Sequence, residues 1–465
     1  MKQSIIKWVV PAGLVIAGIV LVYIWTSADV ATQLTERLPI AENAPQIFPD
    51  EGTAGRIQGE LLASDGVPSD LPGAWPRFRG ANLDAVSSGD VTLARTWGPN
   101  GPKVLWSIEV GEGYAGAAIL AGRVYILDYD HKKQADAIRC LSLADGKEIW
   151  RYSYPVKIKR NHGMSRTVPS VTDKYVVTLG PKCHVTCLDS MTGQFRWMID
   201  LVKDFKTKVP AWYAGQCPLI DGDRAIIAPG GKALMIAVDC RTGEIVWQSP
   251  NPRGWDMTHS SIMPVDFKGR RIYVYCAGGG AVGISADDGS ILWENPDWKI
   301  RVANVPSPVI AGDDLIFLSG DYNAGSTMLR LLDLGGRITT QTVFRLAADV
   351  FGSPQQTPIF YNGYIYGVRP DEQLVCLDLN GRIVWTSTSV HCFGKGPYII
   401  ANGLIYIMND SGVLTLAEAA PAGYVQLAKA RVLDGPESWG PMAIASGRLI
   451  LRDLTRMICL DIAQH

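Results

Sequence analysis

One short stretch of the chain decides its fold: residues 239–247 read DCRTGEIVW. Its Thr242-Gly243 pair forms a turn, because glycine supplies the backbone angles that a tight hairpin needs. The turn leads into a strand that ends in Trp247, and the same turn and strand recur along most of the chain. The final tryptophan returns every 44 to 50 residues, or after twice 46 in the last case, at Trp106, Trp150, Trp197, Trp247, Trp293 and Trp385.

A second marker keeps phase with the tryptophans. A proline precedes four of them by 27 to 29 residues, at Pro169, Pro218, Pro264 and Pro358. Between the markers each unit contains four short strand-like runs separated by turns. A repeat of about 40 to 50 residues with four strands is typical of a β-propeller blade, so the sequence predicts an all-β propeller.

Counting the predicted innermost strands gives eight blades. These strands begin at Ala118, Pro169, Pro218, Pro264, Pro308, Pro358, Pro397 and Pro441. The fifth unit has Phe344 where its tryptophan should be, and the seventh offers only residues 425–427 for its last strand. The eighth unit ends at residues 457–462 without a fourth strand, whereas residues 103–110 form a strand with no blade of its own. We therefore expect this N-terminal strand to complete the eighth blade and close the ring.

Composition and charge limit the classes of function. The 465 residues are 47% hydrophobic and 19% charged, which is the composition of an ordinary globular protein with a large core. The formal net charge is −1. This near-neutrality argues against nucleic acid as a partner, because nucleic-acid binding needs a basic surface.

Residues 1–28 predict a transmembrane anchor. The stretch from Trp8 to Ala28 is uncharged and mostly apolar, and it is long enough to span about 30 Å of hydrocarbon. Lys2 and Lys7 should stay in the cytoplasm, which places the propeller on the periplasmic or extracytoplasmic side. The alternative is a cleaved signal peptide, since residues 26–28 offer a small-residue cleavage site.

A proline-rich segment follows the predicted anchor. Residues 29–74 contain Pro39, Pro45, Pro49, Pro68 and Pro72 among acidic and small residues, without a sustained period. Prolines in that setting favour an extended, semi-rigid spacer. We therefore expect a linker over residues 29–74 and the propeller over residues 75–465.

Nine cysteines on the oxidising side of a membrane would ordinarily suggest disulfides. Four of them, however, precede a leucine at the same place in their units: Cys140, Cys187, Cys376 and Cys459. That position predicts small, buried side chains in a tightly packed strand. A disulfide between Cys183 and Cys187 is the alternative for that pair.

Polar and aromatic residues gather just before the predicted innermost strands. In a propeller these segments converge on one face of the central channel, the channel mouth, which is the default place for a ligand. The candidate binding residues are Arg160, His162, Arg166, Trp212, Gln216, His259 and Trp439. The same segments carry Tyr114, Tyr213, Asn304, Gln355, Gln356, His391 and Lys395. The alternative interpretation is that these side chains cap strand ends with hydrogen bonds.

Two arginines and a histidine within residues 160–166 are the most specific part of this set. Guanidinium groups suit a carboxylate or phosphate, so we expect any small anion to contact Arg160 or Arg166 together with His162. His162, His259 and His391 belong to the second, fourth and seventh blades, so the sequence predicts no metal site. Paired acids at predicted strand connections are interpreted as solvated turn residues: Asp128 with Asp130, Asp221 with Asp223, Asp287 with Asp288, and Asp313 with Asp314.

From Trp75 to the C-terminus the chain resembles the PQQ-binding-like β-propeller repeat proteins, whose branches include quinoprotein alcohol dehydrogenases and the BamB outer-membrane assembly lipoprotein. The motifs that carry the resemblance are residues 75–84, 187–197 and 242–247. Quinoprotein dehydrogenases are known for two adjacent cysteines, a calcium site and a catalytic aspartate. This sequence has no adjacent cysteines and no calcium ligands or catalytic aspartate at matched positions. Its first cysteine is Cys140, so the lipidated cysteine of the assembly lipoprotein has no counterpart.

These observations favour a non-enzymatic scaffold, a membrane-anchored, single-pass propeller that binds other proteins in an envelope complex. No catalytic residue and no cofactor are expected. The alternative is a divergent quinoprotein-type oxidoreductase or a small-ligand-binding propeller, with PQQ and calcium at the channel mouth. Recognition of carbohydrate or peptidoglycan is a third interpretation. The repeat identifies a fold and leaves the reaction open.

Overall fold

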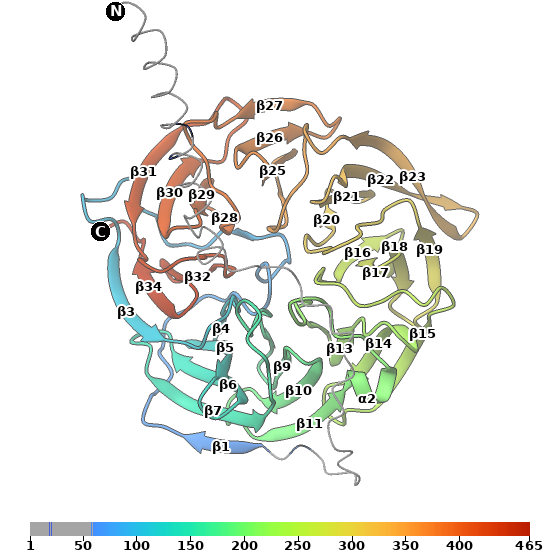
Figure 1. Cartoon of the computed structure of the whole chain (residues 1–465), viewed down its shortest axis with the longest axis horizontal. Helices are drawn as coiled ribbons and strands as arrows, with labels where there is room; N and C mark the ends of the chain where they lie inside the picture. The colour runs from blue at the N-terminus through green and yellow to red at the C-terminus, as the bar shows by residue number, and fades with distance from the viewer. Residues whose placement is uncertain (1–17, 19, 21–56, 58) are drawn as a thin grey trace, which may run out of the picture. The chain divides into compact units, whose positions relative to one another are not determined.

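The computed structural model describes residues 18, 20, 57 and 59–465. In this part of the chain eight antiparallel blades surround a central axis, with the first strand of each blade nearest the axis (Figure 1). The predicted eight-bladed, all-β propeller is therefore confirmed, and each predicted innermost strand begins within two residues of its expected position.

The first four blades follow one another along the chain. Blade 1 consists of β4 (Ala118–Leu120), β5 (Arg123–Asp130), β6 (Ala135–Ser142) and β7 (Glu148–Pro155). Blade 2 consists of β8 (Ser170–Val171), β9 (Tyr175–Leu179), β10 (His184–Asp189) and β11 (Phe195–Asp200). Blade 3 consists of β12 (Leu219–Asp221), β13 (Arg224–Ile227), β14 (Ala233–Asp239) and β15 (Ile245–Pro250). Blade 4 consists of β16 (Met263–Phe267), β17 (Arg270–Ala277), β18 (Gly280–Ser285) and β19 (Ile291–Asn295).

The last four blades complete the ring. Blade 5 consists of β20 (Val309–Ile310), β21 (Leu315–Gly320), β22 (Gly325–Leu334) and β23 (Arg337–Leu346). Blade 6 consists of β24 (Ile359–Tyr361), β25 (Tyr364–Val368), β26 (Leu374–Asp378) and β27 (Ile383–Thr386). Blade 7 consists of β28 (Tyr398–Ala401), β29 (Leu404–Met408), β30 (Val413–Glu418) and β31 (Gln426–Arg431). Blade 8 consists of β32 (Ala443–Ala445), β33 (Arg448–Arg452), β34 (Arg456–Asp461) and β3 (Lys103–Glu109).

The ring closes through β3, as the sequence predicted. This strand pairs antiparallel with β34, and Trp106 lies opposite Cys459 in the register. The N-terminal strand therefore supplies the outer strand of the last blade. Such a closure joins both ends of the ring by main-chain hydrogen bonds and satisfies the outer edge of β34.

The repeated tryptophans are buried between adjacent blades, with exposures from 2% for Trp150 to 9% for Trp385. The Trp197 indole N–H donates to the carbonyl of Cys240 in the next blade at 2.8 Å. The turn glycine of that next blade, Gly243, has a φ of +79°, and a Cβ on it would lie 2.6 Å from the Trp197 ring. Gly381 lies against Phe344 in the same way, which confirms that Phe344 takes the tryptophan's place in blade 5.

The middle strands are apolar because each blade packs between two others. Six of the seven residues of β14 are buried, whereas burial alternates along β15 at the outside of the same blade. The hydrophobic core is therefore a ring of layers between blades. A single-turn helix, α2 (Leu201–Phe205), follows β11, and the side chain of Asp200 caps its start by accepting from the Lys203 backbone N–H at 3.1 Å.

Two further strands precede the ring in sequence. β1 (Glu60–Ala63) pairs antiparallel with β7 and makes blade 1 five-stranded. β2 (Val86–Ser87) pairs in parallel with β28 of blade 7. β1 lies inside the segment expected to be a linker. After it, the Ser64 and Gly66 N–H groups donate to the carbonyls of Ile149 and Glu148, so this part of the segment is hydrogen-bonded to blade 1.

The chain divides into two compact units, Met1–Ala54 and Gly55–His465. The second unit starts before the expected propeller boundary at Trp75. Apart from residues 18 and 20, the anchor predicted over residues 1–28 lies outside the described residues. Among the residues that the structure describes, no helix is long and apolar enough to cross a membrane.

The cysteines lie where a packing role predicts them. Cys140, Cys187, Cys376 and Cys459 are buried, which confirms their predicted role as small core side chains. All nine cysteines are free, including Cys183, so the alternative disulfide is absent.

Candidate functional site

Residues 75–87, here called the crossing segment, run across the end of the channel where the innermost strands finish. Trp75 bridges to Ile119 in blade 1, and the Arg77 guanidinium donates to the Ile220 carbonyl in blade 3 at 2.8 Å. At the other end of the segment, β2 pairs with Ile400 and Ala401 in blade 7. The crossing segment thus connects blades far apart in the ring.

Arg79 fastens the middle of the crossing segment. Its side chain is buried and donates to the carbonyls of Leu83 and Asp84 within the segment, at 2.9 and 3.0 Å. It also donates to the carbonyls of Thr357 and Pro358 in blade 6, at 3.1 and 3.0 Å. Burial lowers the pKa of Arg79 to about 10, and the nearby Asp84 carboxylate partly opposes this effect. The segment is therefore held by a cation bonded to four carbonyls.

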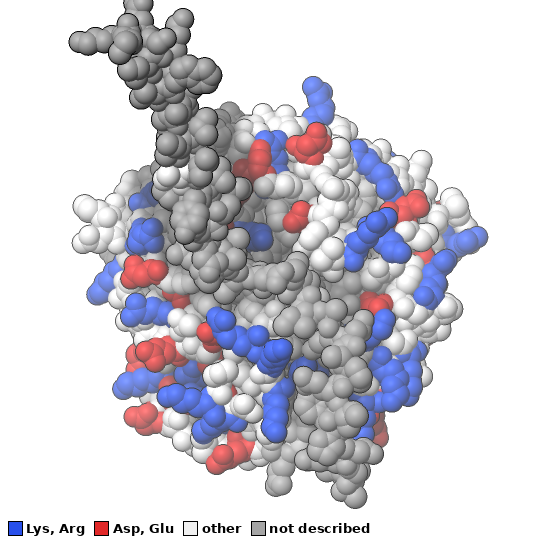
Figure 2. All heavy atoms as spheres, viewed as in Figure 1, with Lys and Arg blue, Asp and Glu red and all other residues white. Residues whose placement is uncertain are grey.

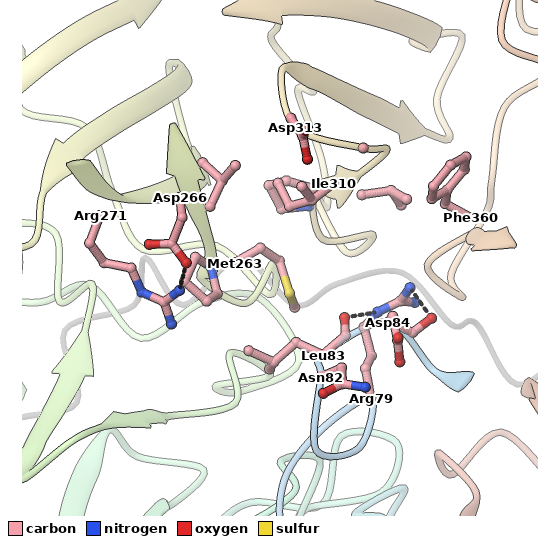
Figure 3. Close-up of a pocket in the computed structure, with 15 residues that line it drawn as sticks. Arg79, Asn82, Leu83, Asp84, Met263, Asp266, Arg271, Ile310, Asp313 and Phe360 are labelled. Atoms are coloured by element: carbon pink, nitrogen blue, oxygen red, sulfur yellow. Dashed lines mark hydrogen bonds and ion pairs between the residues drawn. The ribbon is translucent and has the colours of Figure 1, made fainter. Parts of the chain in front are cut away.

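A pocket of about 320 Å³ opens beside this segment (Figure 3). One wall is the crossing segment and the other is formed by blades 4, 5 and 6. Its lining residues are Arg79, Asn82, Leu83, Asp84, Met263, Pro264, Val265, Asp266, Arg271, Pro308, Val309, Ile310, Gly312, Asp313 and Phe360. The sequence did not predict this site, because Asp313 was interpreted as a solvated turn acid and residues 75–84 only as a family motif.

The predicted channel mouth lies at the opposite end, where the chain enters the innermost strands. Arg166 stacks its guanidinium 4.9 Å from the centre of the Tyr114 ring and donates through Nε to the Trp212 carbonyl. Its Nη2 is buried and has no hydrogen-bond partner among the described residues. Burial lowers the pKa of Arg166 to about 10.

His259 lies near Arg166. Its Nε2 is 2.8 Å from the Ala211 carbonyl oxygen, and burial, helped by the positive charge of Arg166, lowers its pKa to about 4. The imidazole is therefore neutral at neutral pH. The His162 and Trp212 rings meet edge to face at 6.4 Å, so the structure brings Arg166, His162, Trp212 and His259 into one region of the mouth.

Tyr114 also contacts an acidic and an aromatic side chain at the mouth. The Tyr114 hydroxyl donates to Glu437 at 2.5 Å, and its ring lies 5.3 Å from that of Trp439. The Trp439 indole N–H donates to Asp410 at 2.7 Å. Glu437 and Asp410 were missed by the sequence reasoning, although Glu437 stands only two residues before the predicted Trp439.

Other predicted site residues have structural partners. Arg160 is exposed and pairs with Glu112 at 2.6 Å. Gln216 is fully buried, and its side chain satisfies both backbone groups of Ala228. His391 packs against Tyr424, with ring centres 5.1 Å apart. Arg160 and Gln216 are thus engaged in an ion pair and in hydrogen bonds within the fold.

The backbone at the mouth is held in an uncommon conformation. His162, Trp212, Tyr213 and Glu437 have φ between 56° and 76°, a region that non-glycine residues rarely adopt. Such strain persists only when surrounding contacts hold it, and it often accompanies functional sites. In the described part of the chain, no three histidine, cysteine, aspartate or glutamate side chains gather as a set of metal ligands.

Comparison with known proteins identifies the fold family. A family model described as outer membrane protein assembly factor BamB matches residues 134–387, more than half of the 465 residues. BamB from Moranella endobia (strain PCIT) is 23% identical over 288 residues, which cover 59% of this chain and 69% of that protein.

Two solved structures are similar in fold. BamB from Moraxella catarrhalis has a TM-score of 0.53 at 13% identity, over 77% of this chain and 99% of that one. The computationally designed Ika8 protein has a TM-score of 0.52 at 10% identity, over 77% and 100% of the two chains. These structural likenesses speak to the fold alone. The sequence match over more than half of its length shows that this chain belongs to the PQQ-like propeller family described as outer membrane protein assembly factor BamB.

Proposed function

We propose that this protein is a non-enzymatic scaffold that binds other proteins of the cell envelope during outer-membrane protein assembly. Family membership and the name of the BamB relative support this role. The structural observation that carries it is the crossing segment, which fastens blades 1, 3, 6 and 7 to one another. These contacts hold the blades together, so the loops and rim of the ring form a rigid surface. Rigidity lowers the entropic cost of binding a partner.

We place the propeller on the periplasmic side of a membrane, held by the helix expected over residues 8–28. The uncharged length of that stretch and the preceding lysines support an uncleaved anchor. Sequencing the mature N-terminus tests this proposal. A terminus at residue 1 is expected, and one near Asp29 would convert the anchor into a cleaved signal peptide.

The scaffold proposal is tested by affinity purification of the full chain from detergent-solubilised membranes, with mass spectrometry of both proteins and small molecules. We expect envelope proteins in a fixed ratio to the propeller, cross-linked to residues within 55–465. Recovery of a stoichiometric quinone without any protein partner would contradict the scaffold and favour an oxidoreductase.

A small anion at the channel mouth is the second candidate function. It is supported by the Arg166 Nη2 group, which is buried without a hydrogen-bond partner among the described residues. An unsatisfied buried donor is costly, and a ligand carboxylate would satisfy it. The described residues fit the carboxylates of PQQ in this respect, but they offer no set of three acidic, histidine or cysteine ligands for calcium.

Calorimetry tests the second candidate. PQQ, with and without calcium, is titrated into the wild type and into Arg166→Ala. Binding to the wild type that weakens at least tenfold in Arg166→Ala would place the anion at the mouth, since a charge-assisted hydrogen bond to a buried donor is lost. Equal affinities would remove Arg166 from the site.

A further inference from the structure

The crossing segment supplies one wall of the pocket at this end of the channel. Arg79, Asn82, Leu83 and Asp84 form its wall, and the innermost strands β16 and β20 form much of the rest. The Arg79 bonds to Thr357 and Pro358 fix this wall against blade 6. The pocket is thus preformed, which lowers the cost of binding.

The pocket combines apolar walls with acidic groups. Met263, Ile310 and Phe360 present apolar surface, while the Asp313 carboxylate points into the space above Ile310 (Figure 3). The two arginines of the lining are already engaged. Arg79 is bonded to carbonyls, and Arg271 pairs with Asp221 at 3.0 Å and Asp266 at 2.6 Å.

Asp313 differs from the other acids around the pocket. It makes no hydrogen bond or ion pair with any described residue, whereas its neighbour Asp314 pairs with Arg330 at 3.2 Å. Asp84 accepts a hydrogen bond from the Val86 backbone N–H at 2.9 Å. The lining therefore carries an acid without a cation partner beside apolar walls.

We propose that this pocket binds a lysine or arginine side chain presented by a partner polypeptide. The aliphatic stem lies against Met263, Ile310 and Phe360, and the cationic group pairs with Asp313. Lysine and arginine side chains match the apolar and acidic parts of the pocket, because each combines an apolar stem with a charged end. The inference rests on the proposed scaffold function and names the part of the surface that recognises the partner.

The pocket is tested with N-acetyl-lysine methylamide, and with the norleucine analogue that keeps the stem but lacks the charge. Ligand-observed NMR titrations use the full chain in detergent at low salt. We expect the lysine compound to saturate the protein with a millimolar Kd and to bind at least threefold more tightly than the norleucine compound. Added salt should reduce that difference, because the carboxylate is exposed.

Asp313→Asn is the discriminating variant, and Asp287→Asn, an exposed turn acid of blade 4 outside the pocket, is its control. We expect Asp313→Asn to remove the preference for lysine and Asp287→Asn to retain it. Equal binding of the two compounds to the wild type, an unchanged preference in Asp313→Asn, or no saturation by lysine would each overturn the proposal.

A failure of the pocket is distinguishable from a failure of the scaffold. Asp313→Asn is also taken through the membrane purification described above. Reduced recovery of the envelope partner supports the pocket as its docking point. Unchanged recovery overturns the proposed role of the pocket and leaves the proposed scaffold function standing. Absence of any partner from the wild type overturns the scaffold function itself.

Discussion

At the scale of single residues, the repeating feature is the contact between a tryptophan of one blade and a turn glycine of the next blade. Four of the six repeated tryptophans donate their indole N–H to a carbonyl of the next blade, as in Trp247 to Ala286 at 3.1 Å. The Trp150 and Trp293 N–H groups have no hydrogen-bond partner among the described residues. The turn glycine of the blade after Trp247, Gly289, lies against the Trp247 ring, where a Cβ would come within 2.5 Å of it. The sequence revealed both residues as markers, but not that they meet, because the contact joins successive units.

Replacing Trp247 with alanine should destabilise the propeller by about 3–5 kcal/mol, because a large buried side chain leaves a cavity between blades 3 and 4. Chemical denaturation of the two proteins measures the change. Val246→Ala is the matched control, since Val246 is the adjacent residue and 45% exposed. A Trp247→Ala variant as stable as the control would show that the packing role is wrong.

A buried carboxylate between blades 1 and 2 gives the protein a pH dependence. Asp136 is fully buried, and its Oδ2 and the Tyr154 hydroxyl both lie within 3 Å of the place that a Cβ on Gly180 would take. Burial raises the pKa of Asp136 to about 7, partly opposed by Tyr154. This group could not be predicted from the sequence, because Asp136 lies within the ordinary strand pattern of β6.

The folded-state pKa of Asp136 lies above the unfolded value of about 4, so the folded protein holds this proton more tightly. The resulting stabilisation is complete below about pH 4 and is lost as the pH rises to about 7. The free energy of unfolding of Asp136→Asn, relative to that of the wild type, should therefore rise by up to about 1.4 kcal/mol per pH unit between about pH 5 and 7. Above that range it should rise no further. Denaturation curves at several pH values test this prediction, and a constant difference between the two proteins would contradict it.

At the scale of elements, the periodic strands were predictable and the contacts between distant segments were not. Asp128 illustrates the limit. It was interpreted as a solvated turn acid, but β5 continues through it, and its buried carboxylate pairs with Arg139 at 3.0 Å and accepts from the Gly111 backbone N–H at 2.7 Å. The crossing segment could not be predicted from the sequence either, because its strand β2 has only two residues and so shows no periodic pattern.

Hydroxyl side chains link the innermost strands in a way that no single repeat reveals. The backbone N–H groups of Cys217, Ser261 and Ser307 donate to Ser261, Ser307 and Thr357 of the following blades, at 2.9 to 3.0 Å. Each bond joins two blades close to the channel. The ring therefore has hydrogen bonds near its axis as well as beside the outer tryptophans.

Arg79→Met should release the crossing segment, because methionine keeps the apolar stem but loses all four bonds to carbonyls. Hydrogen exchange measured by mass spectrometry should be at least tenfold faster at residues 85–87 than in the wild type. Arg95→Met is the control, since Arg95 makes an exposed ion pair with Glu418. Unchanged exchange at residues 85–87 would show that β2 alone holds the segment.

At the scale of the whole molecule, the described residues 59–465 form a closed ring with two differently built channel ends. The described part of the visible surface mixes basic and acidic residues (Figure 2), in keeping with a net charge of −1. The sequence predicted the ring, its closure and one end of the channel. The pocket at the other end could not be predicted, because it is assembled from the crossing segment and blades 4, 5 and 6.

The measurement that tests the scaffold claim most directly is photo-cross-linking in intact cells. A photoreactive residue is placed at Asn82 beside the pocket, at Arg160 beside the channel mouth, or at Val390, which is 79% exposed between blades 6 and 7. We expect a discrete cross-link to an envelope assembly protein from at least one position, and from Asn82 if the pocket is the docking point. Absence of a protein cross-link from all three positions, with the propeller folded and correctly located, would contradict the scaffold function.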